Sequence, residues 1–250
     1  MDISITTIMI VSLVGILMGA MGAIIGSTLL ILVPLLSLLG LPIQTAIGTA
    51  KVSVISREIV PAVYFYNRNL VRIGLAVPFS IAAIIMSFIG SMIAISLNDA
   101  VLEKIVAGCM LLISAVILLN PNIGLKEKTI PVKAGHIVVS IILGALVGFY
   151  VGIFGGGGNV FIIFGFVIIF GNSFLQATAN SKIPNLLITA ASLPMFMVND
   201  FINWELAIPL TICTAIGARF GAGLAINKGS RFIRGLFVGL VLVFALKYLI

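Results

Sequence analysis

The chain has 250 residues, of which 61% are hydrophobic and only 8% are charged, and its mean hydropathy is +1.32. This composition excludes a soluble globular protein and predicts an all-α polytopic membrane protein, because backbone polar groups inside a bilayer must be satisfied within the segment that crosses it. Fourteen Lys and Arg against seven Asp and Glu give a net charge of +7. In membrane proteins such an excess is the ordinary topology signal, so we expect the lipid bilayer as a partner and no nucleic acid.

A helix needs about 20 apolar residues to cross a bilayer, and each half of the chain holds enough for about four to five membrane segments. In the first half we predict segments near residues 6–24, 29–39, 45–66, 73–97 and 101–119. In the second half we predict segments near residues 136–153, 160–170, 174–198, 204–226 and 232–249. The second segment of each half is too short for an ordinary span, so broken or short helices are expected at the centre.

A hydrophilic joint separates the two halves. Residues 120–133 hold two prolines, Gly124 and four charged side chains. We therefore predict a first membrane repeat over residues 1–120, a cytoplasmic linker over 121–133 and a second membrane repeat over 134–250.

The two halves are copies of each other, because residue n of the first half matches residue n + 131 of the second. Lys51 matches Lys182, and Leu-Ala-Val-Pro at 75–78 matches Leu-Ala-Ile-Pro at 206–209. Near the start of each copy the offset is 129, and there Gly15 and Gly19 match Gly144 and Gly148, for which close helix packing is the expected role. A duplication with this long period is typical of the two halves of a transporter.

The charges predict that the two repeats are inverted. Three connections are basic, and they contain Arg68 and Arg72, the linker, and the stretch 228–234. Two connections, near 98–104 and 199–205, together hold four acids and one lysine. Basic connections face the cytoplasm, and all three do so only if each half crosses the membrane an odd number of times. The second repeat then has the opposite orientation, with substrate bound near the midplane between the repeats.

Lys51 and Lys182 are the main candidates for substrate binding. A lysine within an apolar span is costly unless it lines the bundle interior or a watery path. The alternatives are a side chain that snorkels to the interface and a neutral buried lysine. Because both repeats carry this lysine, we favour a shared central site that attracts a small anionic substrate.

Polar and glycine residues near the lysines extend the predicted site. Glycine allows close backbone approach, and a helix start offers free N–H groups to an anion. The candidates of this kind are Gly155, Gly156, Gly157, Gly158 and Asn159 in the second half, with Ser27 and Thr28 in the first. Hydroxyl and amide donors on the lysine segments add Thr49, Asn180 and Ser181.

Four further residues are candidates for coupling or accessory roles. Arg57 and Glu58 are adjacent, so they point in different helical directions and need not pair with each other. Glu58 is a candidate for proton coupling, with an interfacial position as the alternative. Asn185 offers a further amide, and Arg219 is either a second anion-attracting group or a snorkelling residue.

The sequence resembles the TauE/SafE sulfite exporter family over nearly its whole length. The resemblance rests on Gly148-x3-Gly152-x2-Gly155-Gly-Gly, on Ala-Thr-Ala-Asn-Ser-Lys at 177–182 and on Ala-Ile-Gly-Thr-Ala-Lys at 46–51. Gly-Ala-Arg-x-Gly at 217–221 and Arg231-x2-Arg234 are also similar to the family. It departs from the family where Gly26-Ser27-Thr28 replaces a fuller glycine cluster and where Gly165 replaces a frequent proline. The resemblance implies transport of sulfite, sulfonates or related sulfur-containing anions across a prokaryotic plasma membrane.

The sequence thus predicts a secondary transporter of a small sulfur-containing anion. A passive anion channel, or a transporter of the same fold for a carboxylate or other organic anion, is the alternative. The spans lack an acidic pair and a metal-ligand cluster, so we expect no enzyme activity, no cofactor and no metal. Proton coupling and a homo-oligomer are both compatible with this plan.

The inverted arrangement predicts a labelling pattern. Single cysteines introduced as Arg68→Cys and Asp200→Cys, with Cys109 and Cys213 replaced by alanine, should react with a membrane-impermeant reagent from opposite sides of the membrane. The linker side should expose position 68. Reaction of both positions from one side would contradict the inverted plan.

Overall fold

The computed structural model describes residues 5–26, 28–71, 76–93, 124–126, 134–153, 155 and 157–249. Over these ranges all regular secondary structure is helical, and no strand occurs. The predicted segment at 101–119 and most of the linker at 121–133 lie outside the described residues.

The described helices follow the predicted order in both halves. In the first half they are α1 (Ile5–Ile24), α2 (Leu29–Leu38), α3 (Ile43–Tyr66) and α4 (Ala76–Ile93). In the second half they are α6 (Ala134–Ile153), α7 (Gly158–Phe170), α8 (Phe174–Val198) and α9 (Trp204–Leu249). Within α9, Gly229 has φ 69° and ψ −171°, so two helices meet there at a kink, as the sequence predicts.

The protein is a polytopic membrane protein. Five of the described helices are long and apolar enough to cross a bilayer, namely α1, α4, α6, α8 and α9. The ten residues of α2 rise only about 15 Å, which is about half of the hydrocarbon thickness. α3 is one continuous helix through Pro61, although it buries charged side chains that dilute its apolar sequence.

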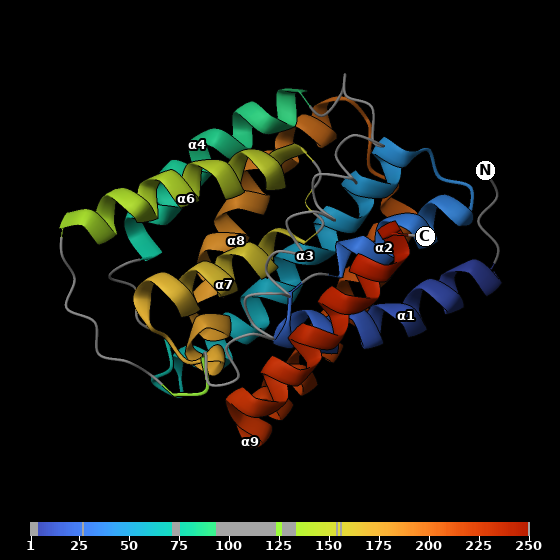
Figure 1. Cartoon of the computed structure of the whole chain (residues 1–250). Coiled ribbons are helices and arrows are strands. Elements are labelled where there is room, and N and C mark those ends of the chain that lie inside the picture. Colours follow the sequence, from blue (N-terminus) through green and yellow to red (C-terminus); the bar gives the residue numbers. More distant parts are fainter. Residues whose placement is uncertain are drawn as a thin grey trace.

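The halves are interlocked, because the first helix of each half packs along the fourth helix of the other half. α1 lies along α9, and α6 lies along α4 (Figure 1). Between these two pairs, α3 contacts α8, while the short helices α2 and α7 pack on α3 and α8 respectively. Among the described helices, each first helix makes its most extensive contact with a helix of the other half.

Glycines make these cross-half contacts close, as predicted. A Cβ on Gly19 of α1 would clash with the backbone of Thr214, and a Cβ on Gly148 of α6 would clash with the backbone of Ala83. The two glycines are related by the shorter offset of the duplication, and their partners by the longer one. Two further contacts are related in the same way, Gly221 with Ala20 and Gly90 with Phe149. Equivalent residues of the two copies therefore make equivalent contacts.

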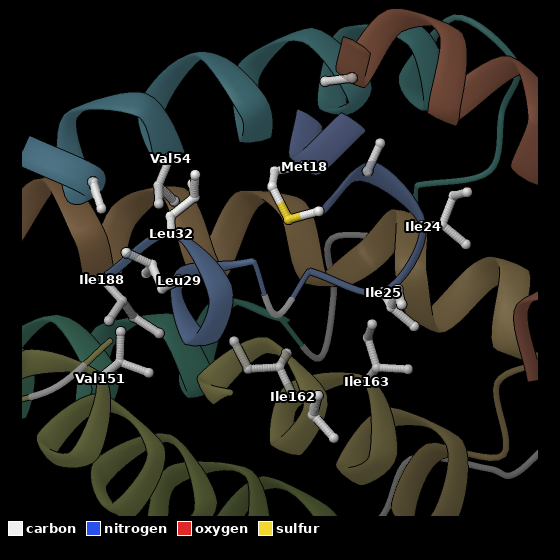
Figure 2. Close-up of a cluster of buried hydrophobic side chains, with 14 of the residues drawn as sticks. Met18, Ile24, Ile25, Leu29, Leu32, Val54, Val151, Ile162, Ile163 and Ile188 are labelled. Atoms are coloured by element: carbon white, nitrogen blue, oxygen red, sulfur yellow. The ribbon is translucent and has the colours of Figure 1, made fainter. Parts of the chain in front are cut away.

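Two helices end in the middle of this arrangement. α1 ends at Ile24 and α6 ends at Ile153, and the short helices α2 and α7 begin a few residues later, at Leu29 and Gly158. We call these two helix ends, together with the starts of α2 and α7, the crossing. Gly26 and Gly155 take left-handed φ values of 77° and 79° here, a conformation that side chains with a Cβ rarely adopt. Figure 2 shows buried apolar side chains gathered around this region, among them Ile24, Leu29, Val54, Val151, Ile162 and Ile188.

The glycine contacts predict the effect of a larger side chain. Gly148→Val should lower the free energy of unfolding by about 1–3 kcal/mol, because α6 cannot move away from α4 without losing its packing. Thermal unfolding of purified protein in detergent measures this change. Gly135→Val on the same helix is the matched control, since a Cβ there meets no atom within 4 Å. Equal effects of both substitutions would contradict the close contact.

Candidate functional site

Lys51 is buried on α3 and reaches the end of α6. Its Nζ donates to the carbonyl oxygens of Val151 at 3.2 Å and Gly152 at 3.0 Å, and to Ser192 Oγ at 3.0 Å. The Phe196 ring lies beneath the ammonium group, with 4.5 Å between Nζ and the ring centroid. All three protons of the ammonium group therefore have an acceptor, and none of these acceptors is a carboxylate.

Lys182 is buried on α8 and makes the equivalent contact with α1. Its Nζ donates to the carbonyl oxygen of Gly22 at 3.0 Å and lies 3.4 Å from Glu58 Oε2. Gly22 and Val151 are related by the shorter offset of the duplication, so the two lysines bind matching carbonyls of opposite halves. The last carbonyls of a helix lack intrahelical partners and carry partial negative charge. Each lysine therefore caps an interrupted helix of the other half.

Arg57 and Glu58 pair with each other, although as helix neighbours they need not do so. Arg57 donates to Glu58 Oε1 through Nε at 3.2 Å and Nη2 at 3.0 Å, and Asn185 Nδ2 donates to the same oxygen at 2.9 Å. The exposed fractions of the Arg57 and Glu58 side chains are only 1% and 0%, which also excludes the interfacial position considered for Glu58. Burial explains the pairing. Two unpaired charges inside a protein cost far more free energy than the side-chain rotations that bring them together.

Four polar side chains at the crossing or beside it on α3 keep atoms without a hydrogen-bond partner among the described residues. They are Thr28 through Oγ1, Asn159 through both Nδ2 and Oδ1, Arg57 through Nη1, and Glu58 through Oε2, which lies 3.4 Å from Lys182 Nζ. The exposed fractions of Thr28 and Asn159 are 3% and 1%, so the burial of these atoms is nearly complete. Buried polar atoms without partners are uncommon in folded proteins and each needs an explanation.

Three of these side chains lie at one segment, residues 22–28. Arg57 and Asn159 contact it, and Thr28 belongs to it. A Cβ on Gly22 would clash with the Arg57 side chain, and a Cβ on Gly26 would clash with the Asn159 amide. Thr28 ends the segment and precedes α2, while Asn159 lies in the first turn of α7. Thr28 and Asn159 are related by the longer offset of the duplication, so the two copies place a polar side chain at the start of each short helix. Neither helix start has a side-chain cap.

The buried charges do not balance. Among the described residues, Lys51, Arg57 and Lys182 oppose a single buried carboxylate, that of Glu58, which leaves a formal net charge of +2 when all four groups are ionised. The other carboxylates among the described residues, Asp200 and Glu205, are exposed. Uncompensated buried positive charge is unfavourable, so this region is suited to accepting a negative charge.

Other predicted residues have local roles. The Thr49 hydroxyl accepts from the backbone N–H of Asn203 at 2.9 Å, just before α9. Ser181 Oγ donates to the carbonyl of Thr178 within its own helix at 2.9 Å. Asn180 is buried on the same helix, with 4% exposed.

The remaining candidates divide between the crossing and the surface. A Cβ on Gly155 would lie 3.2 Å from Lys51 Cε, and Gly157 and Gly158 begin α7 beside it. Ser27 and Gly156 lie outside the described residues. Arg219 is exposed and stacks over the Tyr64 ring, 4.0 Å from its centroid, so it takes no part in the buried cluster.

Sequence reasoning missed the acceptors of the lysines. Ser192 carries no charge and belongs to no motif, and the carbonyls of Gly22, Val151 and Gly152 are backbone atoms that every residue has. The available signal was the duplication, because a lysine repeated beside a repeated helix end suggests a shared contact.

The profile of a family described as "Sulfite exporter TauE/SafE" matches residues 11–248. The chain belongs to the TauE/SafE family. The glycine-to-lysine motifs that suggested this family are the segments that form the crossing. No solved structure matches the chain.

Relatives of the chain are named as membrane transporters. A "Probable membrane transporter protein" of Haemophilus influenzae is 26% identical over 238 residues, covering 95% of this chain and 92% of that protein. The "Probable membrane transporter protein YfcA" of Escherichia coli is 28% identical over 240 residues, covering 94% and 87%. YdhB of Bacillus subtilis, with the same description, is 25% identical over 248 residues, covering 95% and 99%. The TauE/SafE chain thus belongs to a family of probable membrane transporters rather than of named enzymes.

The shared contacts of Glu58 predict energetic coupling with Lys182. Lys182→Met and Glu58→Gln should each destabilise the protein, and the double variant should lose less than the sum, by about 0.5–3 kcal/mol. Thermal unfolding in detergent of the four proteins gives this difference.

Lys51→Met combined with Glu58→Gln is the control for this cycle. Lys51 binds neutral acceptors only and lies about 10 Å along α3 from Glu58, so these two effects should add within about 0.5 kcal/mol. Additive effects in the Lys182 cycle would contradict the buried pair.

Proposed function

We propose that the protein is a secondary transporter that moves a small sulfur-containing anion across the plasma membrane, binding it between the two repeats. The observation that carries this proposal is, among the described residues, a buried excess of positive charge beside buried donors that have no partner. Family membership supports the transporter class, and the description of the family as sulfite exporters supports a sulfur oxyanion.

The free donors at the crossing fit an oxyanion. Arg57 Nη1 and Asn159 Nδ2 are N–H donors, and the Thr28 hydroxyl is free to donate. The uncapped starts of α2 and α7 add backbone N–H groups and the positive ends of two helix dipoles. An anion with several oxygens on one central atom spreads its acceptors over separate positions, so it can accept from donors that lie apart from one another.

A carrier agrees better with this geometry than a channel does. The groups proposed to bind the anion are buried, with Arg57, Thr28 and Asn159 each at most 3% exposed. An anion reaches them only after a change of conformation, which is the property that separates a carrier from an open pore. The distribution of basic and acidic connections supports an inverted arrangement with a cytoplasmic linker at 121–133, and we include both in the proposal.

The proposal is tested first by ligand binding. We expect sulfite, thiosulfate or methanesulfonate to raise the midpoint of thermal unfolding of the purified protein, and the anion that does so to enter proteoliposomes with saturating kinetics. Chloride and acetate are the comparison anions. A panel in which no sulfur anion binds, or rapid non-saturating flux, would contradict the proposed transporter.

The unpartnered atoms give a sharper prediction, because binding and stability should change in opposite directions. Asn159→Leu and Thr28→Val remove buried groups without partners, so each should stabilise the ligand-free protein by about 1 kcal/mol or more. The same changes should weaken anion binding about tenfold, since each removes a donor worth about 1.5–3 kcal/mol to a charged group.

Thr211→Val is the matched control for Thr28→Val. The Thr211 hydroxyl already donates to the carbonyl of Ala207 within α9 at 2.6 Å. We therefore expect no gain in stability and no change in anion binding, measured by the same unfolding and calorimetric titrations. Unchanged binding in the Asn159 and Thr28 variants would remove both residues from the site.

A further inference from the structure

We propose that Glu58 is the internal counter-ion of the anion site and that it takes up a proton when the substrate anion binds, so that anion and proton cross the membrane together. This inference rests on the proposed function. Its starting point is the position of the Glu58 carboxylate on the cations that would attract the substrate.

The Glu58 carboxylate pairs with cations from two helices at once, Arg57 of α3 and Lys182 of α8. Its Oε1 accepts from Arg57 Nε and Nη2 and from Asn185 Nδ2, and its Oε2 lies 3.4 Å from Lys182 Nζ. Only Nη1 of the Arg57 guanidinium stays without a partner. A substrate anion that engages this guanidinium and the Lys182 ammonium group more fully must therefore compete with the Glu58 carboxylate.

The duplication shows that the second copy forms its matching helix without this ionic group. The positions that correspond to Arg57 and Glu58 in the second half, at the longer offset of the duplication, are Ile188 and Thr189. α8 nevertheless forms a continuous helix there. The acceptors of the hydrogen bonds that Lys51 donates at the end of α6 include no carboxylate. The charged pair was thus dispensable in one copy and is present in the other, which favours a functional role.

The charged groups around Glu58 explain why a proton would accompany the anion. Arg57 faces it from α3 and Lys182 from α8, while α1 has no ionisable side chain over Ile5–Ile24. On α9, which also packs against α3, Arg219 instead stacks on Tyr64. With no substrate, the single carboxylate compensates the charge of one of these two cations. When an anion binds beside it, two negative groups share one water-poor site, and like charges at short distance disfavour ionisation of both.

The proton balance of one transport cycle is simple. A proton from water binds the Glu58 carboxylate as the anion binds, which leaves Arg57 and Lys182 to the anion. The anion and the proton leave on the other side, and the ionised Glu58 returns to the cations. The empty protein then changes conformation with the Glu58 carboxylate paired again with Arg57 and Lys182. The consequence is symport of one proton with each anion.

The first test uses the wild-type protein and so does not depend on a variant that folds. Calorimetric titration with thiosulfate and methanesulfonate, which are ionised at neutral pH, is repeated in buffers of different ionisation enthalpy. We expect a heat that depends on the buffer and reports uptake of about one proton for each anion bound. Binding without proton uptake between pH 5 and 8 would overturn the role of Glu58 and leave the proposed function intact. Absence of binding would overturn both.

The second test removes the titrating group. Glu58→Gln should abolish proton uptake on binding, abolish accumulation driven by a pH gradient in proteoliposomes, and bind the anion about tenfold more tightly because the competing charge is gone. Glu58→Asp should retain the proton uptake, which distinguishes a titrating role from a structural one. Proton uptake in Glu58→Gln, or its loss in Glu58→Asp, would contradict the proposal.

Discussion

The fold depends on two helices that end inside the protein. A helix end in the interior leaves carbonyl groups without partners, and inside a membrane there is no bulk water to donate hydrogen bonds to them. α1 and α6 end in this way, and Lys182 and Lys51 donate to their final carbonyls. Because each lysine comes from the opposite half, these hydrogen bonds from lysine to backbone carbonyls also hold the two halves together.

The helix pairs α1 with α9 and α4 with α6 serve the same constraint. They bring each interrupted helix to the lysine that caps it, and small residues such as Gly19 and Gly148 allow the close approach. The centre of the protein then holds the ends of α1 and α6, the short helices α2 and α7, and the long helices α3 and α8, which bury polar side chains. This region is where a membrane protein can tolerate broken backbone, since it is buried in protein and not exposed to lipid.

The polar groups of the centre fall into two classes. Those of Lys51, Thr49 and Ser181 have partners that explain them as structure. Those of Thr28 and Asn159 do not, and Arg57 has one free N–H edge. Unsatisfied buried donors persist in proteins where function requires them. The neighbouring excess of positive charge fits an anion as their partner, as proposed above. The two copies have also diverged, since the first half supplies Arg57 and Glu58 and the second supplies the glycine run and Asn159.

The sequence by itself determined the membrane class, the duplication, the order and approximate bounds of the described helices, and the importance of Lys51 and Lys182. Hydrophobic length and internal repetition are properties of the chain, so they can be read without a structure. The tertiary structure decided which atoms meet. Arg57 and Glu58 pair because both are buried, although neighbours on a helix point apart, and Arg219 stays outside because its helix face is at the surface. The lysines cap carbonyl groups, which leave no mark in a sequence. The unpartnered donors among the described residues are recognised only when the hydrogen bonds around them are known.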